Sequence, residues 1–299
     1  MHYIGRYAPS PTGPLHFGSL IAAVASYCDA KANAGKWLLR IEDLDQPREI
    51  AGAVNTILQQ LETFGFEWDD KITYQSQRSQ YYADAFNQLQ KQHLTYPCTC
   101  TRKEIADSSN HLGIEGLIYP NTCLQHAIKP NTAAAFRIKT NSAPISFNDV
   151  IQGNICQTLS TDSGDFVLKR ADGLFTYQLA VVVDDAAQGV THIVRGADLL
   201  ASTPRQIYLQ QLLRLTQPIY THVPIATNAA GEKLSKQTKA PAVDTQFAGQ
   251  TLFHALDFLG QNPPAEIINS QPAEIWNWAI KNWQLHKIPR QKYLFYNKQ

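Results

Sequence analysis

The pattern of apolar positions at the start of the chain predicts two consecutive strand–helix units. Tyr3–Tyr7 and Trp37–Ile41 are short apolar and aromatic runs, as in buried β-strands. Each run is followed by apolar residues at helical spacing, over Phe17–Cys28 in the first unit and over Ile50–Phe64 in the second. This order of elements is typical of a parallel sheet in an α/β fold.

The pattern changes between about residue 95 and residue 170. Cysteines, prolines and short β-like runs such as Ala134–Ile138 replace the long helical stretches there. The elements expected after this region are, in chain order, a buried strand at Leu179–Val183, a strand at His192–Val194, a helix near 203–215, a strand near Val223–Ala226, and helices near 251–260 and 273–283.

We therefore expect an α/β fold in which a Rossmann-type parallel sheet is interrupted by an inserted α+β subdomain and followed by a short helical C-terminal segment. We assign residues 1–78 and 172–238 to the sheet domain, residues 79–171 to the inserted subdomain and residues 239–299 to the helical segment.

Composition and charge limit the classes of protein that this chain can represent. It has 299 residues, of which 44% are hydrophobic and 17% charged, as in globular proteins. The net charge of +1 excludes a uniformly basic nucleic-acid-binding surface, so local patches would have to contact any RNA partner. Five cysteines do not indicate a disulfide-rich secreted scaffold, and Cys28 and Cys156 are expected to be core thiols.

The N-terminal residues carry no signal-peptide pattern. Residues 7–28 lack charged side chains, but Pro9, Pro11 and Pro14 interrupt them, which argues against a membrane span. We expect a soluble, cytoplasmic protein that does not bind a membrane.

Residues 6–19 join the first predicted strand to the first predicted helix. In α/β proteins this edge of the sheet is where nucleotides bind. His16 and Gly18 fall at the helix start, where unpaired backbone N–H groups and the helix dipole favour an anion, and Gly18 lets a ligand approach the backbone. The alternative is a proline-rich turn with a capping hydroxyl and a partly buried histidine.

Four segments, in this order, resemble motifs of the class I aminoacyl-tRNA synthetases of the glutamyl and glutaminyl type. Pro9–Gly13 followed by His16-x-Gly18 is similar to the His-Ile-Gly-His motif, with Ser19 in place of the second histidine. Arg40–Asp45 is similar to the segment Arg-Ile/Phe-Glu-Asp-Thr-Asp of these enzymes. Val194–Asp198 is similar to their Arg-Gly-x-Asp element. Gly231–Lys236 is similar to their Lys-Met-Ser-Lys-Ser loop.

The resemblance implies that the protein joins the carboxylate of an amino acid to the α-phosphate of ATP, with Mg²⁺, and releases pyrophosphate. It assigns catalysis to His16, Lys233 and Lys236. The ATP-binding residues that it implies are Pro9, His16, Gly18, Ser19, Lys233, Ser235 and Lys236. These residue types suit a phosphate-binding site, because a helix N-terminus and flexible lysines both stabilise the negative charge of phosphates as it develops.

The amino acid implied by the resemblance is L-glutamate. The residues assigned to its pocket are Arg6, Ala8, Ser10, Glu42, Tyr177 and Arg195. A guanidinium can make a bidentate contact with a carboxylate that a neutral amide mirrors less well, and Glu42 supplies the opposite charge for the ammonium group. Asp43 and Asp45 are expected to form surface ion pairs instead.

Three cysteines of the inserted region indicate a tetrahedral structural zinc site; they are Cys98, Cys100 and Cys123. Ligand chemistry alone leaves His111 or His126 as the fourth ligand. The resemblance to short glutamyl-synthetase-like proteins, which combine Cys-x-Cys with Tyr-x₃-Cys, points to Tyr119. Three thiols packed together in a core are the alternative.

The segment after Lys236 is short for this family, and we expect no separate anticodon-binding domain. That architecture resembles a short branch that activates glutamate without tRNA and attaches it to the queuosine base at the anticodon wobble position of tRNA(Asp). The partners implied are tRNA(Asp), L-glutamate and ATP, and we expect a monomer. The alternatives are a minimal glutamyl-tRNA synthetase that charges the 3′ end of tRNA(Glu), a non-catalytic RNA-binding paralogue, and a small-molecule adenylyltransferase.

The last residues, Lys281–Gln299, combine basic and aromatic side chains and contain no acidic residue. Such a segment can contact RNA through phosphates and stacked bases. It can equally pack its aromatic side chains on the rest of the protein.

Overall fold

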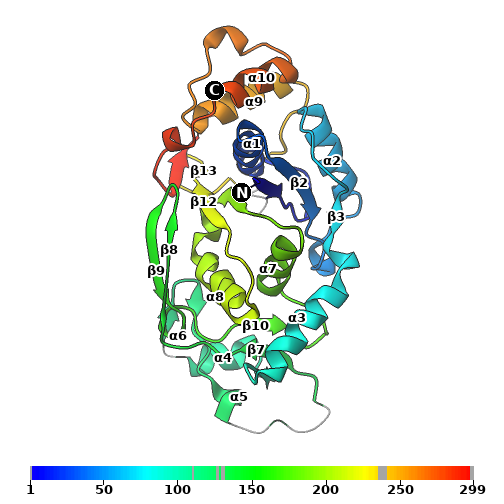
Figure 1. Ribbon diagram of the computed structural model, residues 1–299. Coiled ribbons are helices and arrows are strands. Elements are labelled where there is room, and N and C mark those ends of the chain that lie inside the picture. The colour runs from blue at the N-terminus through cyan, green and yellow to red at the C-terminus, as the bar shows by residue number, and fades with distance from the viewer. Residues whose placement is uncertain (1, 110, 126–127, 129–131, 235–240, 297–299) are drawn as a thin grey trace.

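The computed structural model describes residues 2–109, 111–125, 128, 132–234 and 241–296. The molecule is elongated, with the parallel strands near its middle, the C-terminal helices at one end and the cysteine-bearing region at the other (Figure 1). No helix in the described part of the chain is long and apolar enough to cross a membrane.

The parallel sheet is built around β1 (Ile4–Tyr7). On one side β1 pairs with β2 (Lys36–Ile41), which pairs with β3 (Thr73–Tyr74). On the other side lies β11 (His192–Gly196), where the Thr191 amide donates to the Ile4 carbonyl at 2.9 Å. β11 pairs in parallel with β12 (Ile219–Val223), so the predicted parallel α/β sheet is confirmed.

Helices cover this sheet. α1 (Phe17–Ala32) is buried along most of its length, and α2 (Ala53–Thr63) follows β2. α7 (Tyr177–Ala187) and α8 (Thr203–Leu213) precede and follow β11 (Figure 1). Cys28 is buried in α1, as predicted.

The prediction of a strand at Leu179–Val183 is wrong, because these residues lie inside the helix α7. The run is apolar without interruption, and all its residues are buried. A helix that is buried on every side carries no amphipathic period, so its sequence resembles that of a buried strand.

The region predicted to be inserted, residues 79–171 (the inserted region below), contains at its start the helix α3 (Ser79–Lys91), which the sequence analysis did not anticipate. β4 (Thr95–Cys98), β7 (Ala135–Ile138) and β10 (Val167–Lys169) form an antiparallel sheet in the order β10-β7-β4. The smaller elements of this region are α4 (Arg102–Ser108), β5 (Leu112–Gly113), β6 (Gly116–Leu117), α5 (Thr122–Gln125) and α6 (Leu159–Asp162).

A hairpin of β8 (Pro144–Asp149) and β9 (Gly153–Thr158) extends from this region to the parallel sheet. At its turn the Val150 amide donates to the Tyr220 carbonyl of β12 at 3.1 Å. Cys156 lies on the exposed side of β9, so its prediction as a core thiol is wrong. Strand residues alternate between faces, and this position falls on the solvent side.

The C-terminal helices α9 (Ala248–Phe258) and α10 (Pro272–Asn282) pack on α1 at one end of the molecule (Figure 1). β13 (Ile225–Thr227) then pairs in parallel with β14 (Tyr293–Phe295). Short 3₁₀ helices complete the described elements: η1 (Gln46–Arg48), η2 (Gln75–Gln77), η3 (Ala197–Ser202), η4 (Ala265–Ile267) and η5 (Leu285–Lys287).

The aromatic residues of the C-terminal segment divide into packed and exposed ones. The Trp283 indole donates to Asp29 at 3.0 Å, and the Tyr296 ring stacks on Phe17 with the ring centroids 3.8 Å apart. Tyr293 and Phe295, in contrast, are each 57% exposed on β14. The segment is therefore anchored by packing and still presents aromatic rings to solvent.

Candidate active site

A cleft of about 720 Å³ opens at the carboxyl ends of β1, β2 and β11. This is the edge at which open α/β sheets bind their ligands. The described residues that were predicted to act in catalysis or to bind glutamate or ATP all line this cleft: Arg6, Ala8, Pro9, Ser10, His16, Gly18, Ser19, Glu42, Tyr177, Arg195 and Lys233. Ser235 and Lys236, also predicted, lie outside the described residues.

His16 is the N-cap residue of α1. Its Nδ1 accepts a hydrogen bond from the Ser19 amide at 3.2 Å, and the Ser19 hydroxyl oxygen accepts one from the His16 amide at 2.9 Å. Because Nδ1 is an acceptor, a neutral His16 carries its proton on Nε2. Ser19, which replaces the second histidine of the motif, thus caps the helix and fixes the tautomer of His16.

The loop that carries Lys233 closes against the start of α1. The Lys233 ammonium group pairs with Asp198, which belongs to the 194–198 motif. The Leu234 amide donates to the Ala226 carbonyl of β13 at 2.8 Å. Two motifs that are distant in the sequence therefore meet at the mouth of the cleft.

Arg6 and Arg40 share a buried carboxylate beneath the cleft. Asp185 Oδ1 lies 3.1 Å from Arg6 Nε and 2.8 Å from Arg40 Nη1. Burial raises the pKa of Asp185, but Arg6 and Arg40 outweigh it, so the pKa lies below its ordinary value. Arg40 also contacts Glu42, at 3.4 Å. Burial raises the pKa of Glu42, although Arg40 and Arg6 oppose this effect.

The neighbouring Asp184 is a second buried carboxylate with its own cation. It pairs with Arg78 Nε at 2.5 Å and accepts hydrogen bonds from Gln75 and Tyr82. The sequence analysis did not predict Asp184 or Asp185. The sequence does contain a signal for them, since the two acidic residues directly follow the apolar run Leu179–Val183. Acidic side chains next to such a buried run are expected to have a cationic partner, because a charged side chain is rarely buried without one.

Outside this buried group, the prediction for Asp43 and Asp45 holds in part. Asp45 pairs with Arg48 at 2.5 Å and with Arg170 at 3.3 Å. Asp43 instead accepts hydrogen bonds from the amide and the hydroxyl group of Ser76.

Arg195 is 5% exposed, and its direct partners are neutral. Its Nε donates to His222 Nε2 at 3.0 Å and its Nη1 to the Tyr177 hydroxyl at 3.3 Å, and its Nη2 donates to Thr203 and Gln206. Burial raises the pKa of Tyr177, which keeps that hydroxyl uncharged. The ion pairs found among the described residues do not include Arg195. A buried cation of this kind favours an anionic ligand.

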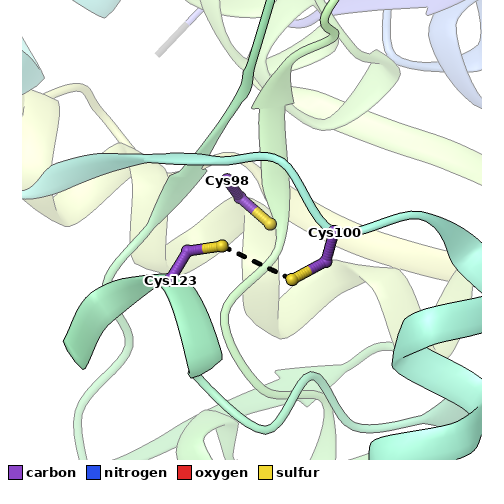
Figure 2. A group of neighbouring side chains, drawn as sticks. All are labelled: Cys98, Cys100 and Cys123. Carbon is purple, nitrogen blue, oxygen red and sulfur yellow. Dashed lines mark hydrogen bonds between the residues drawn. The ribbon is translucent and has the colours of Figure 1, made fainter. Parts of the chain in front are cut away.

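The three cysteines of the inserted region converge. Cys98 ends β4, Cys123 lies on α5, and their sulfur atoms point toward that of Cys100 (Figure 2). The three Sγ atoms lie within 4.8 Å of one another, and Cys100 and Cys123 are 3.4 Å apart. This spacing fits thiolates around one tetrahedral ion.

Tyr119, which is predicted to be the fourth ligand, lies beside this cluster. Its hydroxyl oxygen lies 3.5 Å from Cys100 Sγ and accepts a hydrogen bond from the Cys123 amide at 2.8 Å. His111 is exposed. Among the described residues, it does not belong to the group of side chains that lie close enough together to bind one metal ion. His126 lies outside the part of the chain that the structure describes.

The fold is that of known synthetases. The structure of the glutamate-tRNA synthetase from Elizabethkingia anophelis superimposes with a TM-score of 0.81 at 24% identity, covering 100% of this chain and 68% of that chain. At this identity the likeness concerns the fold alone.

Sequence comparison is more specific. The family model described as "tRNA synthetases class I (E and Q), catalytic domain" matches residues 4–258. The glutamyl-Q tRNA(Asp) synthetase of Dechloromonas aromatica is 52% identical over 97% of this chain and 96% of its own length. Its counterpart from Thiobacillus denitrificans is 51% identical over 96% and 95%. The chain therefore belongs to the class I tRNA synthetases of the glutamyl and glutaminyl type and, within them, to the glutamyl-Q tRNA(Asp) synthetase family.

Proposed function

We propose that this protein uses ATP and Mg²⁺ to activate L-glutamate in the absence of RNA, and then transfers the glutamyl group to the queuosine base at the anticodon wobble position of tRNA(Asp). The names of its relatives support the acceptor. The observation that carries the choice of amino acid is the buried guanidinium of Arg195.

The other buried arginine residues at the described part of the cleft are paired with carboxylates. Three buried or half-buried cations lie beside three carboxylates; the groups are Arg6, Arg40, Arg78, Glu42, Asp184 and Asp185. Arg195 has neutral partners and therefore takes a carboxylate of the substrate. Glutamine presents a neutral amide in place of the side-chain carboxylate and leaves this cation without a counter-charge.

Glu42 and Arg6 complete the amino-acid pocket in this proposal. Glu42 contacts Arg40 with one carboxylate oxygen, and it would accept a hydrogen bond from the substrate ammonium group. Arg6, held by Asp185, would bind the second carboxylate, and Ala8 and Ser10 would line the pocket. Such fixed charges orient the substrate carboxylate for attack on the α-phosphate.

The start of α1 would hold ATP. His16 would donate from Nε2 to phosphate oxygens, and the helix dipole would add to this attraction. Gly18 would let the nucleotide approach the backbone, and Pro9 would line the same site. Lys233, together with Lys236 and Ser235, would stabilise the negative charge that develops on the departing pyrophosphate.

The exposed side of β14 would contact the RNA. Tyr293 and Phe295 point to solvent there, and the neighbouring Arg290 and Lys292 are exposed. Tyr293 pairs in register with Ile225, which lines the cleft. Aromatic rings for base stacking and cations for phosphates would then lie beside the cleft that receives the base.

The cysteine cluster would hold one structural zinc ion through Cys98, Cys100, Cys123 and Tyr119. A bound zinc ion would hold together β4, α5 and the segments that carry Cys100 and Tyr119.

The test is the identity of the substrates. We expect glutamate, and neither glutamine nor aspartate, to support exchange of pyrophosphate into ATP without RNA; absence of exchange would contradict the activation. Labelled glutamate should then pass to tRNA(Asp) that contains queuosine and not to tRNA(Asp) that lacks it. Transfer to tRNA(Glu) that disappears when the 3′ adenosine is trimmed would instead identify a minimal glutamyl-tRNA synthetase. Neither exchange nor transfer, with RNA binding retained, would identify a non-catalytic paralogue.

A further inference from the structure

We propose that His222 and Asp149 are positioning residues that orient Arg195 and thereby set the affinity of the cleft for glutamate. This inference rests on the proposed function. Neither residue lines the cleft. They connect it to the hairpin of the inserted region, because Asp149 ends β8 and His222 lies on β12.

The three side chains form one buried chain of hydrogen bonds. Arg195 Nε lies 3.0 Å from His222 Nε2, and His222 Nδ1 lies 2.6 Å from Asp149 Oδ2. His222 and Asp149 are fully buried. A buried polar chain of this kind is costly unless each member is satisfied, so its geometry is strongly constrained.

The environment of Asp149 determines which nitrogen of His222 carries the proton. Asp149 Oδ1 accepts hydrogen bonds from the amides of Ile151, Gln152 and His222. Burial raises the pKa of Asp149, but the hydrogen bonds from His222 and the backbone amides outweigh this effect. The pKa therefore lies below its ordinary value, and the carboxylate is ionised. An ionised carboxylate only accepts, so the proton lies on His222 Nδ1 and Nε2 is the acceptor for Arg195.

The orientation of Arg195 follows from this arrangement. A guanidinium group has five N–H donors in one plane. Nε donates to His222 and both N–H groups of Nη2 have acceptors, on Thr203 and Gln206. These contacts hold the plane so that Nη1, beside the Tyr177 hydroxyl, is the nitrogen presented to the cleft.

The charge of His222 matters as much as its position. A neutral imidazole accepts the Nε–H of Arg195 without neutralising the guanidinium. A carboxylate at position 222 would form an ion pair with Arg195 and compete with the substrate. The negative charge of Asp149 stays one side chain away, where it fixes the tautomer of His222.

Two substitutions of His222 separate these roles. His222→Gln can place its amide oxygen near the position of Nε2 and still accept from Arg195, but it loses the hydrogen bond to Asp149. His222→Asn can reach Asp149 from the position of Nδ1 and loses the contact with Arg195. Tyr220→Phe is the matched control, because it removes one buried hydroxyl from the same strand and keeps the ring beneath Arg195.

The readout is glutamate-dependent pyrophosphate exchange without RNA, with KM measured separately for glutamate and for ATP. We expect the KM for glutamate to rise about tenfold or more in His222→Asn, which corresponds to a loss of about 1.4 kcal/mol of binding free energy. It should rise by a smaller factor in His222→Gln and not at all in Tyr220→Phe. The KM for ATP should be unchanged in all three variants. Asp149→Asn should fall between the two His222 variants.

The inference is overturned if both His222 variants keep the wild-type KM for glutamate. It is equally overturned if they change kcat and the KM for ATP as much as the KM for glutamate, because this pattern indicates a loss of stability only. A wild-type protein without glutamate-dependent exchange would instead contradict the proposed function, so the two failures are distinguishable.

Discussion

The carbonyl oxygen of Leu234 lies 2.9 Å from the point that a Cβ atom on Gly18 would occupy. The same Cβ would also lie 3.2 Å from the His16 ring. Gly18 therefore permits the lysine-bearing loop to approach the start of α1, and the contact joins the two segments proposed to hold ATP.

Gly18→Ala should disrupt this approach, because a backbone carbonyl cannot move aside as a flexible side chain can. We expect pyrophosphate exchange to fall at least about tenfold with a raised KM for ATP. The control is Gly52→Ala, where no atom lies within 4 Å but φ is +79°. That variant should lose about 1 kcal/mol of stability and keep its exchange activity. Normal exchange by Gly18→Ala would show that the loop does not need this contact.

Arg195→Gln should remove a buried cation that forms no ion pair with the described residues. A hydrogen bond to a charged group contributes about 1.5–3 kcal/mol, so we expect the KM for glutamate to rise roughly 10- to 150-fold. Arg195→Lys should not restore it, because an ammonium group cannot reproduce the planar set of contacts. Lys31→Gln, which alters a cation paired with Asp69, is the control and should behave as the wild type. An unchanged KM in Arg195→Gln would rule out this residue as the carboxylate partner.

Substitution of Cys98 and Cys100 by serine should abolish metal binding. We expect elemental analysis to find zinc in the wild-type protein and almost none in the double variant, together with a lower melting temperature, because a structural zinc ion contributes directly to folding. Cys156→Ser alters an exposed cysteine outside the cluster and should retain the metal. Tyr119→Phe should weaken zinc binding without abolishing it. Equal zinc content in all the variants would eliminate the site.

The buried histidine predicts a pH dependence of stability. The charged groups that act on His222 are Asp149, Arg195 and Asp198; burial first and Arg195 next lower its pKa from 6.5 to about 4, against the two carboxylates. In the unfolded chain this histidine binds a proton below about pH 6.5, whereas in the folded protein it stays neutral. Its contribution to stability is therefore complete above pH 6.5 and is lost as the pH falls toward 4.

Urea unfolding at pH 7 and at pH 5 measures this contribution. Between these values the wild type should lose roughly 2 kcal/mol more of its free energy of unfolding than His222→Gln does. Tyr220→Phe should retain the pH dependence of the wild type. The same loss in the wild type and in His222→Gln would mean that His222 is not held neutral in the folded protein.

The exposed rings of β14 can be tested by replacing Tyr293 and Phe295 together with serine. Stacking on a base contributes about 1–3 kcal/mol, so transfer of glutamate to tRNA(Asp) should show a KM for RNA raised at least about fivefold. Exchange of pyrophosphate without RNA should be unchanged and serves as an internal control for folding. Phe247→Ser removes an equally exposed ring elsewhere and should affect neither reaction. A normal KM for RNA would place the contact on another face.

Local patterns in the chain were enough to predict the scaffold of the site. The strand at Tyr3–Tyr7, the turn through Pro9–Gly13 and the helix from Phe17 lie next to one another in the sequence, and their spacing determines which edge of the sheet bears His16. The paired cysteines and the lysine-containing loop are likewise short segments. Their side chains could be named in advance because these short motifs resemble those of a known family.

The interactions that set the charge of the cleft leave no such local pattern. Asp185 is far from Arg6 along the chain, and Asp149 is far from His222, yet each pair is in direct contact. The helical state of Leu179–Val183 likewise depends on burial from all sides, which a uniform apolar run does not reveal. Motif chemistry is encoded over a few adjacent residues, whereas the partners of a buried charge are chosen by packing among distant segments, and packing exists only once the chain has folded.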